Sequence, residues 1–114
     1  MSAPAGPILH IAVASQWEAA GETYRPAAFP REGFVHCSLP HQVLKPANRL
    51  FRGRTDLVLL VIDPSKLTAE LRYEDCYQEG EHYPHVYGPI DRSAVVEVLP
   101  FVPNEDGSFE LPLD

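Results

Sequence analysis

Three side chains that can do chemistry stand next to one another in the segment Gly33–Ser38: the imidazole of His36, the thiol of Cys37 and the hydroxyl of Ser38. Bulky, strand-favouring residues precede them, so we expect them at the exit of a strand. Successive strand side chains alternate between faces, which puts His36 and Ser38 on one face and Cys37 on the other. This pattern indicates a binding or catalytic site. The alternative interpretation is a half-buried structural strand with a hydrogen-bonded histidine.

Two further segments carry imidazole and phenol groups. His10 interrupts the apolar run Ile8–Val13, and His85 lies in Tyr83–Pro89, a segment that its prolines stiffen. Imidazole can donate and accept protons near neutral pH, which suits substrate orientation and proton transfer. Tyr87 adds a ring for stacking and a hydroxyl. We expect one ligand-binding cleft to be lined by His10, His36, Ser38, His85 and Tyr87.

The same residue types allow two other chemistries. Cys76, His82 and His85 are spaced C-x5-H-x2-H, and His36-Cys37 with His41 could add ligands. Structural zinc sites usually show tighter paired spacings, so we predict no metal. A nucleophilic Cys37 needs a base, and His36 does not fit because adjacent strand residues point to opposite faces. Two cysteines make no disulfide framework, so we expect free thiols.

Charge restricts the partners. The net charge of −7 argues against binding to duplex nucleic acid, which requires many phosphates to be neutralised. A local basic cluster, Lys45 to Arg54, contains no acidic residue. Its members Arg49 and Arg52 are candidates for binding a phosphate or pyrophosphate. The alternative is a solvated helix face.

The elements that position these groups are predicted to be short, since the chain contains 12 prolines. Strands are expected at Ile8–Val13, at Leu71–Glu74, at 94–102 and, buried on both faces, within 56–63. Residues 82–90 read as an irregular segment. A last short strand is expected near Phe109 and Leu111.

Two helices are predicted near the N-terminus. The first begins with Ser15 as its cap, and the second is capped by Ser38. Pro46 is expected to kink the second helix. Strands with two early helices indicate an α+β domain with a curved, mostly antiparallel sheet.

The length of 114 residues predicts a single domain, 1–114, with its core at about 8–102 and tails at 1–7 and 103–114. No apolar run approaches the roughly 20 residues of a membrane helix, so we expect no membrane partner. The first residues lack the basic start and apolar run of a signal peptide. We therefore expect a cytoplasmic location.

One set of residues extends over most of the chain: His10-Ile11, Trp17, Tyr24, Gly33-Phe34-Val35-His36-Cys37-Ser38, Gln42, Ala47-Asn48, Glu74 and Pro84-His85-Val86-Tyr87-Gly88-Pro89. In this set the chain resembles the uncharacterised DUF952 family, over residues 8–102. That family is grouped with ADP-ribosyltransferase-like domains. The resemblance implies a split, curved β-sheet with NAD in its central cleft.

The resemblance also implies roles for particular residues. His10 matches the first-strand residue that grips NAD in the wider group, and His36 and Ser38 match the polar end of the second strand. Glu74 is the candidate for the late glutamate that stabilises positive charge at the ribose, and His36 is the second catalytic candidate. The implied function is binding of, or action on, NAD or a related nucleotide, with transferase or glycohydrolase-type chemistry. The alternative is a non-catalytic ligand-binding or protein-interaction module.

Overall fold

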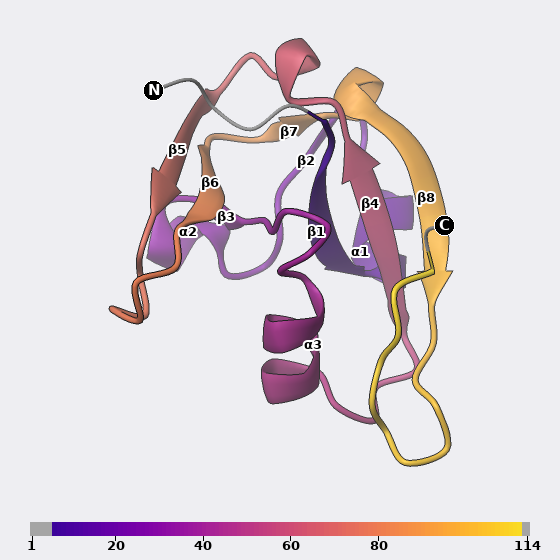
Figure 1. Cartoon of the computed structure of the whole chain (residues 1–114). Helices are drawn as coiled ribbons and strands as arrows, with labels where there is room; N and C mark the ends of the chain where they lie inside the picture. Colours follow the sequence, from indigo (N-terminus) through magenta and orange to yellow (C-terminus); the bar gives the residue numbers. More distant parts are fainter. Residues whose placement is uncertain (1–5, 113–114) are drawn as a thin grey trace.

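A computed structural model describes residues 6–112 of the chain. Its largest sheet has the strand order β1-β4-β8, with β1 at Ile8–Val13, β4 at Leu57–Ile62 and β8 at Val95–Phe101 (Figure 1). Both strand pairs are antiparallel. The six consecutive apolar residues of β4 explain its central place, because a strand covered on both faces needs no polar alternation.

A second sheet carries the candidate site. Its order is β3-β6-β5, with β3 at Val35–His36, β6 at Tyr83–Tyr87 and β5 at Glu70–Glu74, and all pairs are antiparallel. A two-stranded sheet joins β2, Thr23–Tyr24, to β7, Ile90–Asp91. The domain is thus α+β with antiparallel sheets, as the sequence predicts, although its strands are divided among three sheets.

The first two sheets are joined where β3 ends. The backbone N–H of Leu9 donates to the Ser38 carbonyl (2.7 Å), and the N–H of Ser38 donates to the Leu9 carbonyl (2.8 Å). This pair of bonds fixes the residues after β3 against the middle of β1. His10 of β1 and His36 of β3 are therefore held close together.

The helices differ from their predicted boundaries. The α-helices are α1 (Ala14–Ala19), α2 (Phe29–Glu32) and α3 (Leu44–Leu50), and the 3₁₀ turns are Pro64–Lys66 (η1) and Arg92–Ala94 (η2). The prediction of two helices missed α2.

Both predicted serine caps are wrong. Ser15 lies inside α1, whose N-cap residue, Val13, makes no side-chain cap bond. Ser38 forms the bridge to β1, and α3 begins only at Leu44. Pro46 consequently falls in the first turn of α3, where its missing N–H would have no helical partner anyway, so no kink is required.

The prediction of an irregular segment at 82–90 is also wrong. Tyr83–Tyr87 is the middle strand of the second sheet, paired with β3 on one side and β5 on the other. Pro84 cannot donate a backbone bond, but its carbonyl accepts from the N–H of Cys37 (3.0 Å). Pairing on both sides outweighs the turn preference of the prolines.

The core consists of two apolar clusters on the two faces of the largest sheet. One includes Ile8 and Leu60, and the other includes Leu9 and Leu59. Phe109 belongs to the second cluster and stacks on Phe101, with ring centroids 4.6 Å apart. Around Phe109 the described residues form no strand, contrary to the prediction. The core thus extends beyond residue 102, while the predicted tail at 1–7 falls largely outside the described residues.

Within residues 6–112, no helix has both the length and the apolar character that crossing a membrane requires.

Candidate functional site

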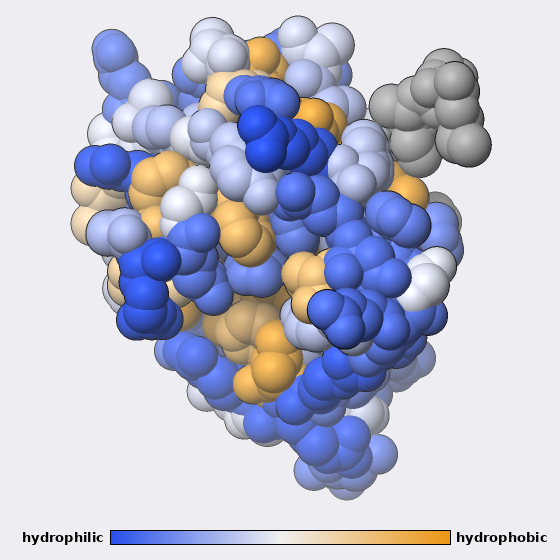
Figure 2. Space-filling model, turned by 90° about the vertical axis from the view of Figure 1, so that its left-hand side faces the viewer, coloured by the Kyte–Doolittle hydropathy of each residue, from blue (hydrophilic) through white to orange (hydrophobic). Residues whose placement is uncertain are grey.

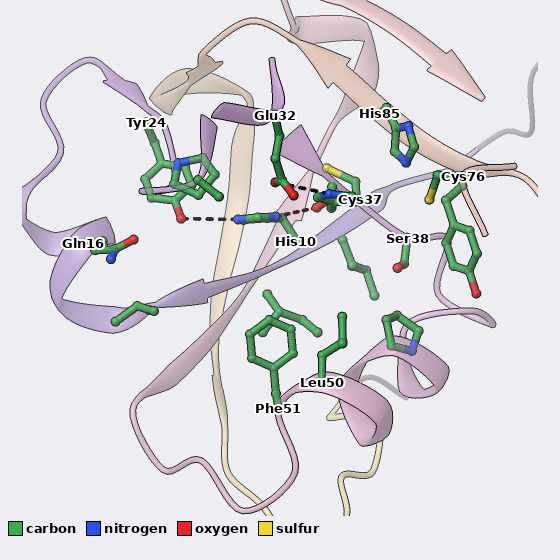
Figure 3. A pocket seen from close by; sticks show the side chains of 18 of the residues that line it. His10, Gln16, Tyr24, Glu32, Cys37, Ser38, Leu50, Phe51, Cys76 and His85 are labelled. Carbon is green, nitrogen blue, oxygen red and sulfur yellow. Dashed lines mark hydrogen bonds and ion pairs between the residues drawn. The ribbon is translucent and has the colours of Figure 1, made fainter. Parts of the chain in front are cut away.

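A cavity of about 380 Å³ opens where the two larger sheets meet. Its walls come from β1, β3, β6, α3 and the turn between β5 and β6 (Figure 3). Figure 2 shows the side of the molecule that lies on the left in Figure 1, where apolar residues are exposed in a hollow surrounded by hydrophilic ones. Four of the predicted site residues line this cavity: His10, His36, Ser38 and His85.

His10 is buried, and both of its ring nitrogens have protein partners. Its Nδ1–H donates to the backbone carbonyl of His36 (2.6 Å), which can only accept. The hydroxyl of Tyr24 therefore donates to Nε2 (3.3 Å). Burial lowers the pKa of His10 to about 4, so the ring is neutral at pH 7. His10 thus fixes the position of β3 and offers a ligand its ring rather than a free nitrogen.

His36 faces the cavity with a carboxylate beside it. Its Nε2 lies 3.3 Å from Oε1 of Glu32, and both side chains are partly exposed. Gly33 makes this approach possible, because its φ of 82° ends α2 in the left-handed region and turns the chain into β3. An imidazole next to a carboxylate can act as a general base or orient a polar ligand.

Cys37 and Ser38 both line the cavity together with His36, although the predicted alternation put Cys37 on the opposite face. Cys37 is buried in the core with Val35, and burial raises the pKa of its thiol well above the usual range, so it is not an activated nucleophile. Ser38 is buried, and the bridge to Leu9 holds its backbone beside β1.

His85 is held by a small network on β5 and β6. Its Nδ1–H donates to Oε1 of Glu74 (2.8 Å), and the hydroxyl of Tyr87 donates to the same oxygen. Phe34 stacks on the imidazole, with ring centroids 4.3 Å apart. Burial lowers the pKa of His85, whereas the Tyr87 and His85 bonds lower the pKa of Glu74. Glu74 and Tyr87 therefore lie behind His85, outside the set of residues that line the cavity.

Arg49 and Arg52 lie apart from this group. Arg49 pairs with Glu79 (3.3 Å), and Arg52 donates to the carbonyl of Asp106 (3.1 Å). Lys45 likewise pairs with Glu79, at 2.9 Å. These contacts match a solvated, charge-paired helix face, and among the described residues that line the cavity there is no lysine or arginine.

Comparison with known proteins places the chain in a family. The model of the family described as "Protein of unknown function (DUF952)" matches residues 11–98. The chain belongs to the DUF952 family.

Solved structures of protein CC0527 from Caulobacter crescentus are similar to this DUF952 chain. The crystal structure has a TM-score of 0.83 at 30% sequence identity, covering 92% of this chain and 94% of that one. The solution NMR structure has a TM-score of 0.79 at 30% identity, covering 92% of each chain. The comparison with curated proteins found no match.

Sequence reasoning did not place most of the lining residues in the DUF952 cavity, among them Tyr24, Glu32 and Cys76. Glu32 had a local signal, since it precedes His36 by four residues across a glycine that can reverse the chain. Nothing in the sequence around Tyr24 or Cys76 indicated that these residues line a cavity. Tyr24 reaches the cavity from β2, and Cys76 reaches it from the turn after β5.

Proposed function

We propose that this DUF952 domain binds NAD or a related nucleotide by placing its nicotinamide or nucleobase ring in the cavity. The observation that carries the proposal is the composition of the cavity wall, which combines aromatic rings with a few polar side chains, among them one closely spaced pair. The rings come from Tyr24, Phe51, Tyr77 and Tyr83, and the pair is His36 with Glu32. Aromatic walls suit a flat heterocycle, and a few well-placed polar groups fix its orientation.

Size and charge limit how much of a nucleotide the cavity would hold. A volume of about 380 Å³ is near the lower end for ligand pockets, which accommodates a ring and its sugar more readily than a whole dinucleotide. Because the described lining has no lysine or arginine, phosphate groups would remain outside it. We also propose that the domain belongs to the ADP-ribosyltransferase-like fold group, as the resemblance implies.

Catalysis, if the domain cleaves NAD, would use Glu32 and His36 in place of Glu74. Glu32 lines the cavity, where a carboxylate can stabilise an electron-poor ribose. His36 would accept the proton from water or another acceptor as the bond from the ribose to nicotinamide breaks. The products with water are nicotinamide, ADP-ribose and a proton.

A second candidate is a binding module without turnover. Two observations favour it. The carboxylate of Glu74 is hydrogen-bonded to His85 and Tyr87, and both ring nitrogens of His10 are hydrogen-bonded within the protein, so these groups are not free to act on a substrate. Nicotinamide release from NAD, followed by chromatography, separates the two candidates. Release by the wild type supports an enzyme, and binding without release supports the module.

Thermal unfolding with nicotinamide, ADP-ribose and NAD tests the binding proposal. Ligand at a hundred times its Kd adds about 2.7 kcal/mol to the free energy of unfolding. Ala28 lines the cavity and is only partly exposed, so Ala28→Phe should fill the space and abolish the rise in Tm. Ala27→Phe is the matched control, because Ala27 is exposed and outside the lining.

The measurements are made in a chelator and repeated with zinc. We expect nicotinamide and NAD to raise the Tm of the wild type and of Ala27→Phe, but not the Tm of Ala28→Phe. No rise with any of the three compounds, or an equal rise in both variants, would contradict the proposal.

A further inference from the structure

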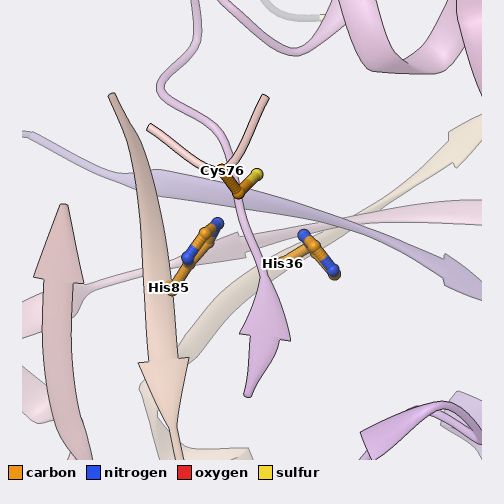
Figure 4. A group of neighbouring side chains, drawn as sticks. All are labelled: His36, Cys76 and His85. Atoms are coloured by element: carbon orange, nitrogen blue, oxygen red, sulfur yellow. The ribbon is translucent and has the colours of Figure 1, made fainter. Parts of the chain in front are cut away.

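Three side chains with metal-binding atoms converge at one wall of the cavity. They are His36 from β3, His85 from β6 and Cys76 from the turn after β5 (Figure 4). One nitrogen of each imidazole and the sulfur of Cys76 all lie within 4.8 Å of one another. The fold creates this group, since antiparallel pairing places His36 directly opposite His85.

A buried, unpartnered nitrogen points to a ligand at this place. His85 is 1% exposed, and its Nε2 has no hydrogen-bond partner among the described residues. Leaving such a group unpaired is unfavourable, because it has given up its bonds to water without gaining a partner in the protein. Because Nδ1 carries the proton donated to Glu74, Nε2 has a free lone pair, the form in which a histidine binds a metal.

The surroundings of both imidazoles are those of metal ligands. Histidine ligands commonly donate their other ring N–H to a carboxylate, which fixes the tautomer and the ring orientation. Glu74 accepts this bond from His85, itself also bonded by Tyr87, and Phe34 stacks on the ring. Glu32 stands beside His36.

The local charge also favours a cation. Glu32 lies 3.3 Å from Nε2 of His36, and Glu74 accepts the bond from His85, so two carboxylates stand beside the three side chains. This negative charge would stabilise a bound divalent ion, to which a coordinating thiol loses its proton.

We propose that His36, Cys76 and His85 bind a transition-metal ion, zinc in preference to others, with a fourth position open to the cavity. Two imidazoles and a thiolate are ligands for zinc and exclude calcium and magnesium, which bind through oxygen. Three protein ligands with an open position are typical of catalytic zinc sites, whereas structural sites have four. Zinc–ligand bonds of about 2.0–2.3 Å place the ligand atoms of a tetrahedral site about 3.3–3.8 Å from one another. The ligand atoms, now within 4.8 Å of one another, would therefore move closer together on binding, and Cys76 is the exposed member of the group.

This site departs from the sequence-based expectation of no metal. That expectation grouped Cys76 with His82 and His85 along the chain and considered His36, Cys37 and His41 as added ligands. In the fold His82 is exposed, and its backbone carbonyl accepts from Gln42 (2.8 Å), while His36 takes the place beside Cys76. The inference does not depend on which compound the cavity binds, but a His36 that holds zinc would not serve as the proton acceptor described above.

Metal titration of the purified chain, without nucleotide, tests the inference. After treatment with a chelator, the wild type should bind one equivalent of Zn²⁺ in competition with a chromophoric chelator. Co²⁺ should give a thiolate-to-cobalt charge-transfer band and the intense visible bands of a tetrahedral site. Failure to bind one equivalent of either ion would overturn the inference.

Variants assign the ion to this group. Cys76→Ser should abolish the charge-transfer band, and His36→Ala should weaken zinc binding more than a hundredfold. Glu74→Gln should weaken zinc binding about 10–100-fold by loosening His85. His82→Ala is the control and should match the wild type. Stoichiometric binding that survives Cys76→Ser and His36→Ala would overturn the inference, because the ion would then lie elsewhere.

Circular dichroism of each variant in chelator checks folding, so that a lost site is not confused with a lost fold. Because no nucleotide is present, a negative metal result leaves the cavity proposal intact. Likewise, a negative nucleotide result in chelator and in zinc leaves the metal inference intact.

Discussion

At the scale of single residues, alternation along a strand was enough to predict part of the site. It predicted that His36 and Ser38 share a face and that Cys37 takes the other; Cys37 is buried in the core, but it also lines the cavity beside the other two. The partners of His10 could not be predicted, because they come from β2 and from the backbone of β3. The resemblance of His10 to an NAD-binding residue did not indicate that both of its ring nitrogens have partners within the protein.

His10→Leu tests whether this histidine holds β3 in place. The change leaves the His36 carbonyl without its donor, so the free energy of unfolding should fall by about 1–3 kcal/mol. Denaturant titration measures this loss. His41→Leu is the control, since His41 is exposed and the change should stay within about 0.5 kcal/mol. Equal stability of the two variants would show that His10 is not a structural anchor.

At the scale of elements, apolar runs led to correct predictions of strands, whereas prolines led to wrong ones. The strands β1 and β4 were predicted well because their apolar residues are bounded by turn formers. The strand β6 was missed because Pro84 and Pro89 indicated a loop, although its neighbours on both sides supply the pairing. The start of α3 was missed because Ser38 bonds to Leu9 instead of capping a helix.

Gly33 is the element boundary on which the Glu32–His36 pair depends. Its φ of 82° is unfavourable for any residue with a Cβ, so Gly33→Ala should lower the free energy of unfolding by about 1–2 kcal/mol. No atom lies within 4 Å of the added Cβ, so the loss would come from the backbone alone.

Gly21→Ala is the matched control for this substitution. Gly21 also has open space around its Cβ position but no positive φ. Its replacement should leave stability unchanged or raise it slightly. Chemical denaturation of both variants compares them directly, and an equal effect at the two positions would show that the left-handed conformation of Gly33 is not what shapes this turn.

At the scale of the whole molecule, composition and the order of elements predicted an antiparallel α+β domain correctly. Its division into three sheets could not be predicted, because it depends on pairings between distant segments, such as Leu9 with Ser38 and Thr23 with Asp91. The same pairings bring β1, β3 and β6 around one cavity. The candidate site is therefore a property of the fold, and only some of its residues could be found along the chain.

The measurement that tests the cavity proposal most directly is an NMR titration of the isotopically labelled chain with nicotinamide and with NAD. The account predicts saturable shifts of the backbone amide signals of His36, Ser38 and Tyr83, which line the cavity. The signals of Arg52 and Val98, both exposed and outside the lining, should stay in place. Shifts confined to the basic segment 45–54, or no saturable shift with either compound, would contradict it.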